Sequence, residues 1–294
     1  MSMRFAVSLA GAQVMEVPRL PATLERASAI GPYSVARPGA VLRVVPGLAR
    51  FLARDGNVIE LAREPASDEG DIESLIQGPL TAALIHQRRE LPLHGATLAP
   101  PNADTALAIV GAQGAGKSTL AYELVRRGWR LLSDDLTRVT RTANGIFAWP
   151  GRTGIKLCRD ACARFALESS RMTRVSGERD KFLAPIAPWS SPLPLRWIIA
   201  VERDPVARDP VERDANRDSL ADVAFEDSVA GRMSLLSENT FRASYIAALG
   251  QMRAHVQMVS AVATATRVVR LLGPGSPEQL AARVIRIATQ RTCG

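Results

Sequence analysis

Lysine is the residue that this sequence most clearly lacks. Only three of its 37 basic residues are lysines, namely Lys117, Lys156 and Lys181, and all the others are arginines. An ammonium is a compact point charge, whereas a guanidinium is a wide planar fork that does not fit a tight phosphate-binding loop. The few lysines in the sequence are therefore expected at positions that require an ammonium. The alternative for Lys156 and Lys181 is that they are surface lysines without a function.

Cysteine and long apolar runs are also scarce. The three cysteines are odd in number and form no CxxC pair, which argues against a disulfide scaffold or a zinc site and fits a reducing cytoplasm. No uninterrupted apolar run is long enough to span a membrane. The apolar patch "MRFAVSL" alternates with polar residues, so we interpret it as a first β-strand rather than a signal peptide. We expect a cytoplasmic protein with no membrane partner.

Clustered basic and aromatic residues are absent too. The net charge of +8 allows an acidic partner, but the basic residues are scattered along the chain. No stretch interleaves aromatic with basic residues, as nucleic-acid-binding surfaces often do. We therefore expect no nucleic-acid partner.

The chain of 294 residues is long enough for one large domain, or for a catalytic domain with a smaller companion. Residues 1–70 show short β segments separated by turns, which predicts a small β-rich N-terminal region. Residues 71–294 alternate strand-like and helix-like segments, so the predicted fold is α/β, with a core sheet flanked by helices.

Several elements have clear boundary signals. The stretch from 66 to 89 is predicted to be helical, with Ser67 or Asp68 as its N-cap. The segment "LTRVTRTANGIFAWP" predicts a hairpin with Asn144-Gly145 at its turn. Residues 203–218 are charged and contain prolines, which indicates an exposed loop. Ser276, Pro277 and Glu278 indicate the start of a final helix.

The strongest motif is a phosphate-binding loop. The stretch from 111 to 118 matches G-x-x-x-x-G-K-[ST], and it follows an apolar strand and precedes an amphipathic helix, as the motif requires. Glycines allow backbone N–H groups to point at phosphates, and the helix N-terminus adds its dipole. Lys117 is expected to reach the β- and γ-phosphates of ATP, and Ser118 to bind Mg²⁺. The predicted nucleotide-binding residues of this loop are Gly111, Ala112, Gln113, Gly114, Ala115, Gly116, Lys117, Ser118 and Thr119.

Two adjacent carboxylates follow one helix and one strand later, in "LLSDD". We expect this strand to lie next to the P-loop strand, with Asp134 and Asp135 at the same edge of the sheet. One carboxylate is enough to hold a metal ion, so the other can accept a proton from an attacking hydroxyl, as in a kinase. A helix cap or turn explains one aspartate of the pair but not both.

At this point the sequence resembles the catalytic domain of the HPr kinase/phosphorylase family. The resemblance is carried by "LHGATL", "GAQGAGKS", "RRGWR" and "LLSDDLTRV", in that order across residues 91–139. A looser match continues through "WPGRTGIKL", "PLRWIIAVER" and "NTFR". More narrowly, the chain is similar to the HPr-kinase-like proteins of lasso-peptide pathways, which phosphorylate a serine of a precursor peptide.

The resemblance implies roles for specific residues. His94 is expected beside the carboxylates, Asp134 as the general base toward the acceptor serine, and Asp135 as a ligand of Mg²⁺. The family also implies ATP as phosphoryl donor, and its members assemble as hexamers, which leaves a homo-oligomer open. Without the flanking pattern, His94 reads as a satisfied strand histidine.

The sequence departs from the bifunctional family after the aspartates. No acidic residue occurs between Asp135 and Asp160, so the family's metal-ligating glutamate is missing or replaced, and phosphorylase activity is not expected. We expect Lys156 or Lys181, or both, to approach the nucleotide phosphates or the acceptor. Arg242 is placed in a helix, where it contacts phosphate or an acidic peptide end, or is a solvated helix arginine.

These observations favour an ATP- and Mg²⁺-dependent kinase that phosphorylates a serine of a peptide or small protein, with a role in lasso-peptide tailoring. A small-molecule kinase of the same fold is the second hypothesis, and it requires a closed pocket rather than an open groove. The third is a nucleotide-gated regulatory ATPase without a phosphoryl acceptor.

Overall fold

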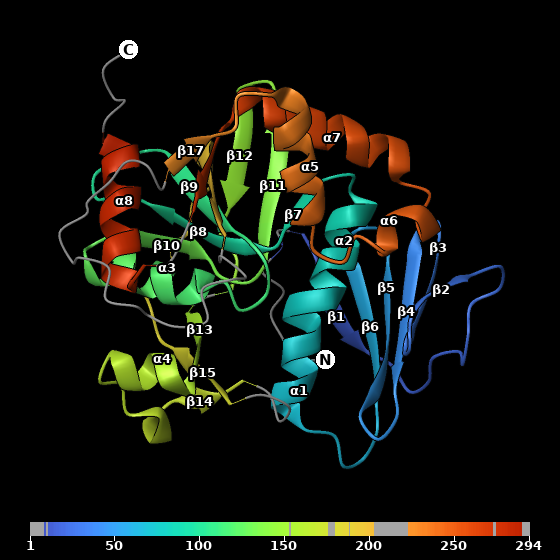
Figure 1. Ribbon diagram of the computed structural model, residues 1–294. Helices are drawn as coiled ribbons and strands as arrows, with labels where there is room; N and C mark the ends of the chain where they lie inside the picture. The colour runs from blue at the N-terminus through green and yellow to red at the C-terminus, as the bar shows by residue number, and fades with distance from the viewer. Residues whose placement is uncertain are drawn as a thin grey trace.

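The computed structural model describes residues 9, 11–152, 154–175, 180–187, 189–202, 223–272 and 275–289. These residues form three β-sheets with helices around and between them (Figure 1). The predicted strand at residues 3–9, except Leu9, and the predicted loop at 203–218, lie outside the described residues.

The N-terminal sheet is a six-stranded meander. Its strands lie in the order β1-β6-β5-β4-β3-β2, and only the β1–β6 pair is parallel. Period-2 alternation buries Ala49, Phe51 and Ala53 on one face of β5. The bounds are β1 (Gln13–Glu16), β2 (Ser28–Gly31), β3 (Ser34–Arg37), β4 (Ala40–Val45), β5 (Ala49–Arg54) and β6 (Val58–Arg63).

One continuous helical segment covers the buried face of this sheet. It consists of α1 (Glu69–Leu75), the π-helical turn η1 (Ile76–Leu80) and α2 (Thr81–Gln87). Asp68 is its N-cap, because its side chain accepts from the N–H of Asp71. Pro79 lies inside η1 and supplies no N–H, which accounts for the wider turn. The core of the N-terminal sheet therefore extends beyond residue 70, and the domain boundary at that residue remains a prediction.

The central sheet has nine strands. Its main path is β10-β8-β9-β16-β12-β11-β7, with β18 paired to both β16 and β17. The pairs β9–β16 and β16–β18 are parallel, and β11 and β12 form the predicted hairpin. The bounds are β7 (Leu91–Leu93), β8 (Gly95–Ala99), β9 (Ala106–Val110), β10 (Arg130–Ser133), β11 (Thr137–Thr142), β12 (Gly145–Trp149), β16 (Leu193–Val201), β17 (Val223–Phe225) and β18 (Arg267–Leu271).

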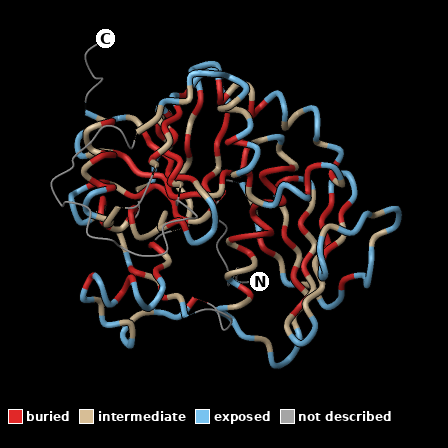
Figure 2. Tube along the Cα trace, viewed as in Figure 1, coloured by how far each residue is buried: buried red, intermediate tan, exposed pale blue. Residues whose placement is uncertain are grey.

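Helices cover both faces of the central sheet, so its strands are buried on both sides (Figure 2). Leu107 and Ile109 of β9 pack with α3 (Lys117–Arg126) and α8 (Pro277–Thr289). Ala108 and Val110 of the same strand belong to the opposite core, with α5 (Val229–Glu238) and α7 (Met252–Ala265). The predicted α/β class, a core sheet flanked by helices, agrees with this arrangement.

A small third sheet packs beside α3. Its strands lie in the order β13-β15-β14, and all pairs are antiparallel. The remaining elements are β13 (Ile155–Cys158), α4 (Arg159–Arg164), η2 (Ser169–Arg171), β14 (Thr173–Arg174), β15 (Lys181–Ala184) and α6 (Tyr245–Ala248).

The stretch "LPLHGATLAP" forms two strands of the central sheet: β7 pairs with β11, β8 pairs with β9 and β10, and His94 lies at the break. One expectation about this sheet is wrong. The "LLSDD" strand β10 is not next to the P-loop strand β9, because β8 lies between them. Since both contacts of β8 are antiparallel, β10 still runs parallel to β9 and ends at the same edge.

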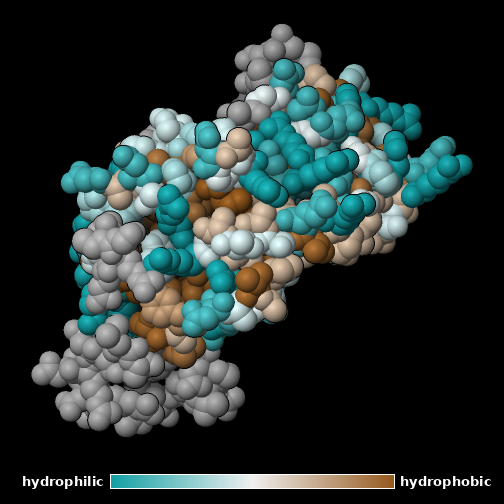
Figure 3. All heavy atoms as spheres, turned by 90° about the horizontal axis from the view of Figure 1, so that it is seen from above, coloured by the Kyte–Doolittle hydropathy of each residue, from teal (hydrophilic) through white to brown (hydrophobic). Residues whose placement is uncertain are grey.

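The surface is mostly polar, with apolar patches between polar areas on the face seen in Figure 3. Exposed large apolar residues include Val229 on α5 and Met252 and Val256 on α7. In the part of the chain that the structure describes, no helix has both the length and the apolar character needed to cross a membrane.

Gly95 provides a test of the central sheet. A Cβ at this position would lie 2.2 Å from the carbonyl oxygen of Ile109 and 3.2 Å from Cγ1 of Val110. We expect Gly95→Ala to lower the free energy of unfolding by about 1–3 kcal/mol, the usual cost of overpacking a core. Gly78→Ala is the control, since a Cβ there meets nothing within 4 Å. Urea unfolding followed by circular dichroism should separate the two variants, and equal stability would contradict this packing.

Candidate functional site

The ends of three strands meet at one edge of the central sheet. The P-loop follows Val110 at the end of β9, and Gly95 at the start of β8 pairs with that residue. Asp134 follows the last residue of β10. This edge is also where the parallel strands β9 and β16 have their carboxyl ends, the usual ligand side of an open α/β sheet.

Glycine is required at the start of the P-loop. Gly111 has φ 144°, and a Cβ there would lie 2.4 Å from the carbonyl oxygen of Val201. Gly114 and Gly116 have φ 82° and 95°, in the left-handed region that other residues seldom adopt. The loop therefore passes against β16 and turns directly into α3, which begins at Lys117.

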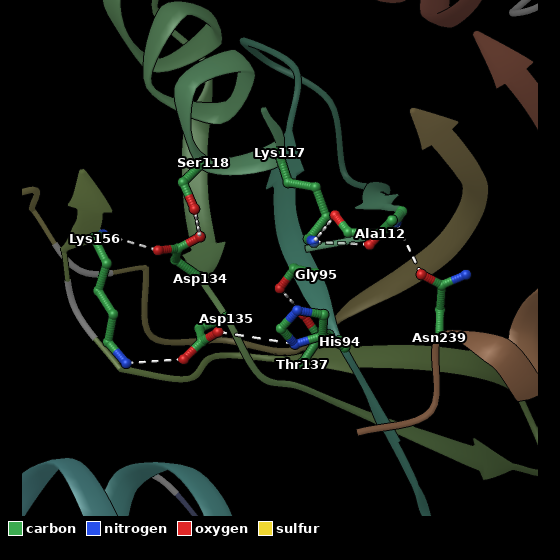
Figure 4. Close-up of polar contacts among 11 residues, drawn as sticks. His94, Gly95, Ala112, Lys117, Ser118, Asp134, Asp135, Thr137, Lys156 and Asn239 are labelled. Carbon is green, nitrogen blue, oxygen red and sulfur yellow. Dashed lines mark hydrogen bonds and ion pairs between the residues drawn. The ribbon is translucent and has the colours of Figure 1, made fainter. Parts of the chain in front are cut away.

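The ammonium of Lys117 lies over the loop. Its Nζ donates to the carbonyl oxygens of Gly111 (2.8 Å) and Ala112 (3.0 Å), as Figure 4 shows. Burial lowers its pKa, and the carboxylates of Asp135 and Asp134 act in the opposite direction. The helix N-terminus, the loop and this lysine form the positive side of the site.

Asp134 is the buried member of the acid pair, with 5% of its surface exposed. Its Oδ1 accepts from Ser118 Oγ at 3.0 Å, and its Oδ2 accepts from the N–H of Lys156 at 2.8 Å (Figure 4). Burial raises the pKa of Asp134 to about 6, helped by the charge of Asp135. The carboxyl group at the end of β10 is thus hydrogen-bonded to α3 and to β13.

Asp135 is more exposed and faces two basic side chains. Its Oδ2 accepts from Lys156 Nζ at 2.8 Å, and its Oδ1 lies 3.8 Å from His94 Nδ1, too far for a hydrogen bond. Burial acts to raise the pKa of Asp135, but Lys156, His94 and Lys181 outweigh it, so the pKa is lowered. Asp135 has φ 72°, in the left-handed region that residues other than glycine seldom adopt.

The structure brings all three lysines to this site. Lys156 on β13 contacts both acids, through its N–H and through its ammonium. Lys181 on β15 lies near enough to contribute to the lowered pKa values of His94 and Lys117, for which burial is the largest cause. The ring of His94 packs against Phe241, with 5.3 Å between the ring centroids.

Arg242 is placed differently from the expectation. It lies in a turn between α5 and α6 with φ 57°, so its predicted helical position is wrong. Its guanidinium lies over the Phe241 ring at 5.5 Å, and its charge acts on Arg43 and Tyr245 beside the N-terminal sheet. Among the described residues, no hydrogen bond or ion pair joins Arg242 to the P-loop.

A buried hydroxyl cluster lies close to the acids and was not predicted from the sequence. Thr137 Oγ1 lies 2.8 Å from Thr97 Oγ1 and 2.6 Å from Ser133 Oγ. The β8–β10 register shifts between Leu131 and Ser133, just before the acid pair. Such irregularities re-aim side chains next to active sites. Nothing in the local sequence marks these hydroxyls, because they come from three different strands.

Asn239, which contacts the first P-loop residue, and Arg152 also belong to the site, and no local sequence signal marks them. A crevice is lined by both acids, Lys156 and Arg152, together with Gln77 and Thr81 of the helical segment. The Nη1 atom of Arg152 is buried and has no hydrogen-bond partner among the described residues, while its Nη2 lies 3.9 Å from Glu73 Oε1. Arg152 thus adds a further cation to the lining of this crevice.

The residues present suit Mg²⁺. This hard cation prefers oxygen ligands, keeps several waters, and is commonly held by one or two carboxylates together with substrate phosphates. Ser118 Oγ and the carboxylates of Asp134 and Asp135 supply that oxygen donor set next to the phosphate loop. No group of three or more His, Cys, Asp and Glu side chains able to hold a metal occurs within the described ranges. An ion bound here therefore relies on phosphates and water as well.

Comparison with known proteins finds a likeness in structure and none in sequence. No protein-family model matches the sequence, and no curated protein matches it. Among solved structures, the fold is similar to that of the Hpr(Ser) kinase/phosphatase from Coxiella burnetii, with 14% sequence identity and a TM-score of 0.32. The likeness covers 68% of this chain and 92% of that chain. At this level it gives no support to a role for any residue of the site.

The raised pKa of Asp134 predicts how stability depends on pH. Because the folded protein binds this proton more tightly than the unfolded chain, its stabilising contribution is complete below pH ~4 and is lost as pH rises through about 6. The neutral side chain of Asn does not titrate. In metal-free, nucleotide-free buffer, Asp134→Asn should therefore be more stable than the unmodified protein at pH 8, by up to about 3 kcal/mol.

Urea unfolding at pH 4.5 and pH 8 measures this difference, which should shrink at the lower pH. Asp180→Asn is the control, because Asp180 lies on the surface and its pKa is lowered by hydrogen bonding to Arg159. That variant should show no stabilisation at pH 8. A stability difference for Asp134→Asn that does not change with pH would contradict the assigned environment.

Proposed function

We propose that this chain is an ATP- and Mg²⁺-dependent kinase that transfers the γ-phosphoryl group to a serine hydroxyl of a peptide or small protein. One observation carries the proposal: the P-loop hydroxyl of Ser118 and the buried carboxylate of Asp134 are directly hydrogen-bonded, at 3.0 Å. A nucleotide whose phosphates occupy the loop then has its terminal phosphate next to a carboxylate that can accept a proton.

In the proposed reaction, the P-loop N–H groups, the α3 N-terminus and Lys117 bind the phosphates of ATP. Ser118 and Asp135 would hold Mg²⁺, which would neutralise negative charge on the phosphates of the nucleotide. The serine oxygen forms a bond to the γ-phosphorus while the bond to the β,γ-bridging oxygen breaks, and ADP leaves. The hydroxyl proton passes to Asp134.

The environment of Asp134 suits a general base. A base works best when its pKa lies near the working pH, and the pKa of Asp134 is raised to about 6. Asp135 has a lowered pKa and an ion pair with Lys156, so it remains a carboxylate, as a metal ligand must. His94 has a lowered pKa, caused first by burial, and is therefore neutral at pH 7 beside Asp135.

One observation favours the reverse assignment of the two acids. Asp134 is the carboxylate that touches Ser118, and Asp135 has the more exposed side chain, at 31%. In that arrangement Asp134 lies on the metal side and Asp135 faces the acceptor. The two assignments predict different effects of Asp134→Asn and Asp135→Asn on kcat and on Mg²⁺ affinity.

The positive charges around the acids bear on the acceptor. Lys156, Lys181 and Arg152 lie near Asp135 or line the crevice beside it. These cations favour an acceptor that carries negative charge near its hydroxyl, such as an acidic peptide segment. A precursor peptide in lasso-peptide tailoring is the acceptor that the sequence resemblance implies.

The proposal is tested with γ-labelled ATP, Mg²⁺ and an array of serine-containing peptides with acidic, neutral or basic flanks. We expect phosphoserine on acidic peptides, detected by mass spectrometry. Asp134→Asn should lower kcat by about 10²–10⁴-fold and leave ATP binding measurable. Asp135→Asn should mainly raise the Mg²⁺ concentration needed for half-maximal rate.

The outcomes distinguish the alternatives. If Asp135→Asn loses kcat and Asp134→Asn loses Mg²⁺ affinity, the reverse assignment holds. Phosphate release without any labelled peptide supports a regulatory ATPase, and transfer to small hydroxyl compounds alone supports a small-molecule kinase. A full transfer rate in both Asn variants would rule out catalysis by this acid pair.

A further inference from the structure

Asn239 connects two parts of the site that are far apart in the sequence. It caps the C-terminus of α5, and its Oδ1 accepts from the N–H of Gly111, the first P-loop residue, at 2.9 Å. Its backbone carbonyl accepts from the N–H of His94 at 2.7 Å. Figure 4 shows its side chain reaching the loop from the side opposite the acid pair. One residue thus contacts both the phosphate loop and the histidine.

The orientation of the Asn239 amide is fixed by a second hydrogen bond. Its Nδ2 donates to the carbonyl oxygen of Leu235 at 2.8 Å, so Oδ1 is the atom presented to Gly111. Both ends of the amide are therefore satisfied, and neither can rotate without losing a bond. A carboxylate at this position keeps the acceptor but loses the donor, and it adds a negative charge beside a loop that binds phosphate.

The segment that carries Asn239 is itself held firmly. The N–H of Phe241 donates to the carbonyl of Pro92 at 2.8 Å, and Thr240 forms a bridge with Leu93. On the other side, Nε2 of His86 lies 2.9 Å from the carbonyl oxygen of Phe241. The segment therefore acts as a short extra strand along β7, fixed between the helical segment and the central sheet.

The position of Gly111 depends on this support. Its Cα packs so closely against Val201 that a Cβ would collide with the carbonyl of that residue. On the other side, the Asn239 amide fixes the direction of its N–H. The carbonyl of Gly111 in turn holds Lys117 Nζ at 2.8 Å. The orientation of the first P-loop residue, and with it the position of the lysine, is set by β16 and by Asn239.

We propose that Asn239 is a positioning residue, which sets the orientation of the first P-loop residue and the backbone of His94 for nucleotide binding. The role rests on the proposed function only in that the loop binds a nucleotide. Asn239 touches none of the reacting atoms. Its removal deletes no phosphate-binding group, but it lets Gly111 and Lys117 leave the geometry that receives the phosphates.

The test compares Asn239→Ala and Asn239→Asp with a control on the same helix. Ser228→Ala removes the N-cap of α5, where Ser228 Oγ accepts from the N–H of Gly231 at 3.0 Å, and so weakens α5 at its other end. Affinity for a fluorescent ATP analogue is measured by titration with Mg²⁺, and transfer kcat and KM are measured separately. Thermal unfolding of all variants records their stability.

We expect Asn239→Ala to weaken nucleotide binding by about five- to tenfold, the loss of one hydrogen bond. Ser228→Ala should leave nucleotide binding unchanged even if it lowers the melting temperature as much as Asn239→Ala does. Asn239→Asp should bind more weakly than Asn239→Ala at low salt and approach it at high salt, because salt screens the added charge. A purely structural role predicts instead that affinity falls only in step with the melting temperature, equally in Asn239→Ala and Ser228→Ala.

Equal losses of affinity in Asn239→Ala and Ser228→Ala, or unchanged affinity in both Asn239 variants, would overturn the inference. If Asn239→Ala does not fold, Asn239→Asp at high salt, where the added charge is screened, takes its place in the comparison with Ser228→Ala. Failure of the proposed function gives a different result. In that case the unmodified protein phosphorylates no acceptor, but the variants still show the expected pattern of nucleotide affinities. Such a result refutes the kinase and leaves the positioning role intact.

Discussion

The arrangement of the site depends on the hydrogen bonds to the buried carboxylate of Asp134. It follows β10, accepts a hydrogen bond from Ser118 at the start of α3, and accepts another from the N–H of Lys156 on β13. A charge that has lost its water must be compensated by such donors. The central sheet, the phosphate loop and the small third sheet are therefore joined at one carboxyl group.

Local signals in the sequence agree with the structure. The Asn144-Gly145 hairpin and the caps at Asp68 and Ser276 follow from short-range backbone chemistry, and the structure contains each of them. The predicted strand order is wrong because β8 lies between β9 and β10. This pairing joins segments that are apart in the sequence, and the hydrophobic periodicity of a single strand does not encode it. The helical placement of Arg242 failed because the chain turns there with positive φ.

Two kinds of site residue differ in how clearly the sequence marks them. The scarcity of lysine marks Lys156 and Lys181, and both lie close enough to Asp135 to lower its pKa. Asn239 and the hydroxyl cluster of Thr97, Thr137 and Ser133 carry no such mark, because asparagine, threonine and serine are ordinary at helix ends and in strands. Their importance arises only from folding, which brings Asn239 to a loop 128 residues earlier in the chain.

The small third sheet has a consequence for how this site responds to disturbance. Two adjacent strands, β13 and β15, carry Lys156 and Lys181, and β13 also supplies the N–H that compensates Asp134. A rigid shift of this sheet would withdraw two positive charges and one backbone donor from the acids in a single motion. Loosening its hydrophobic contact with α3, through residues such as Ile155 and Phe182, would therefore change the electrostatics of the site without altering any charged residue.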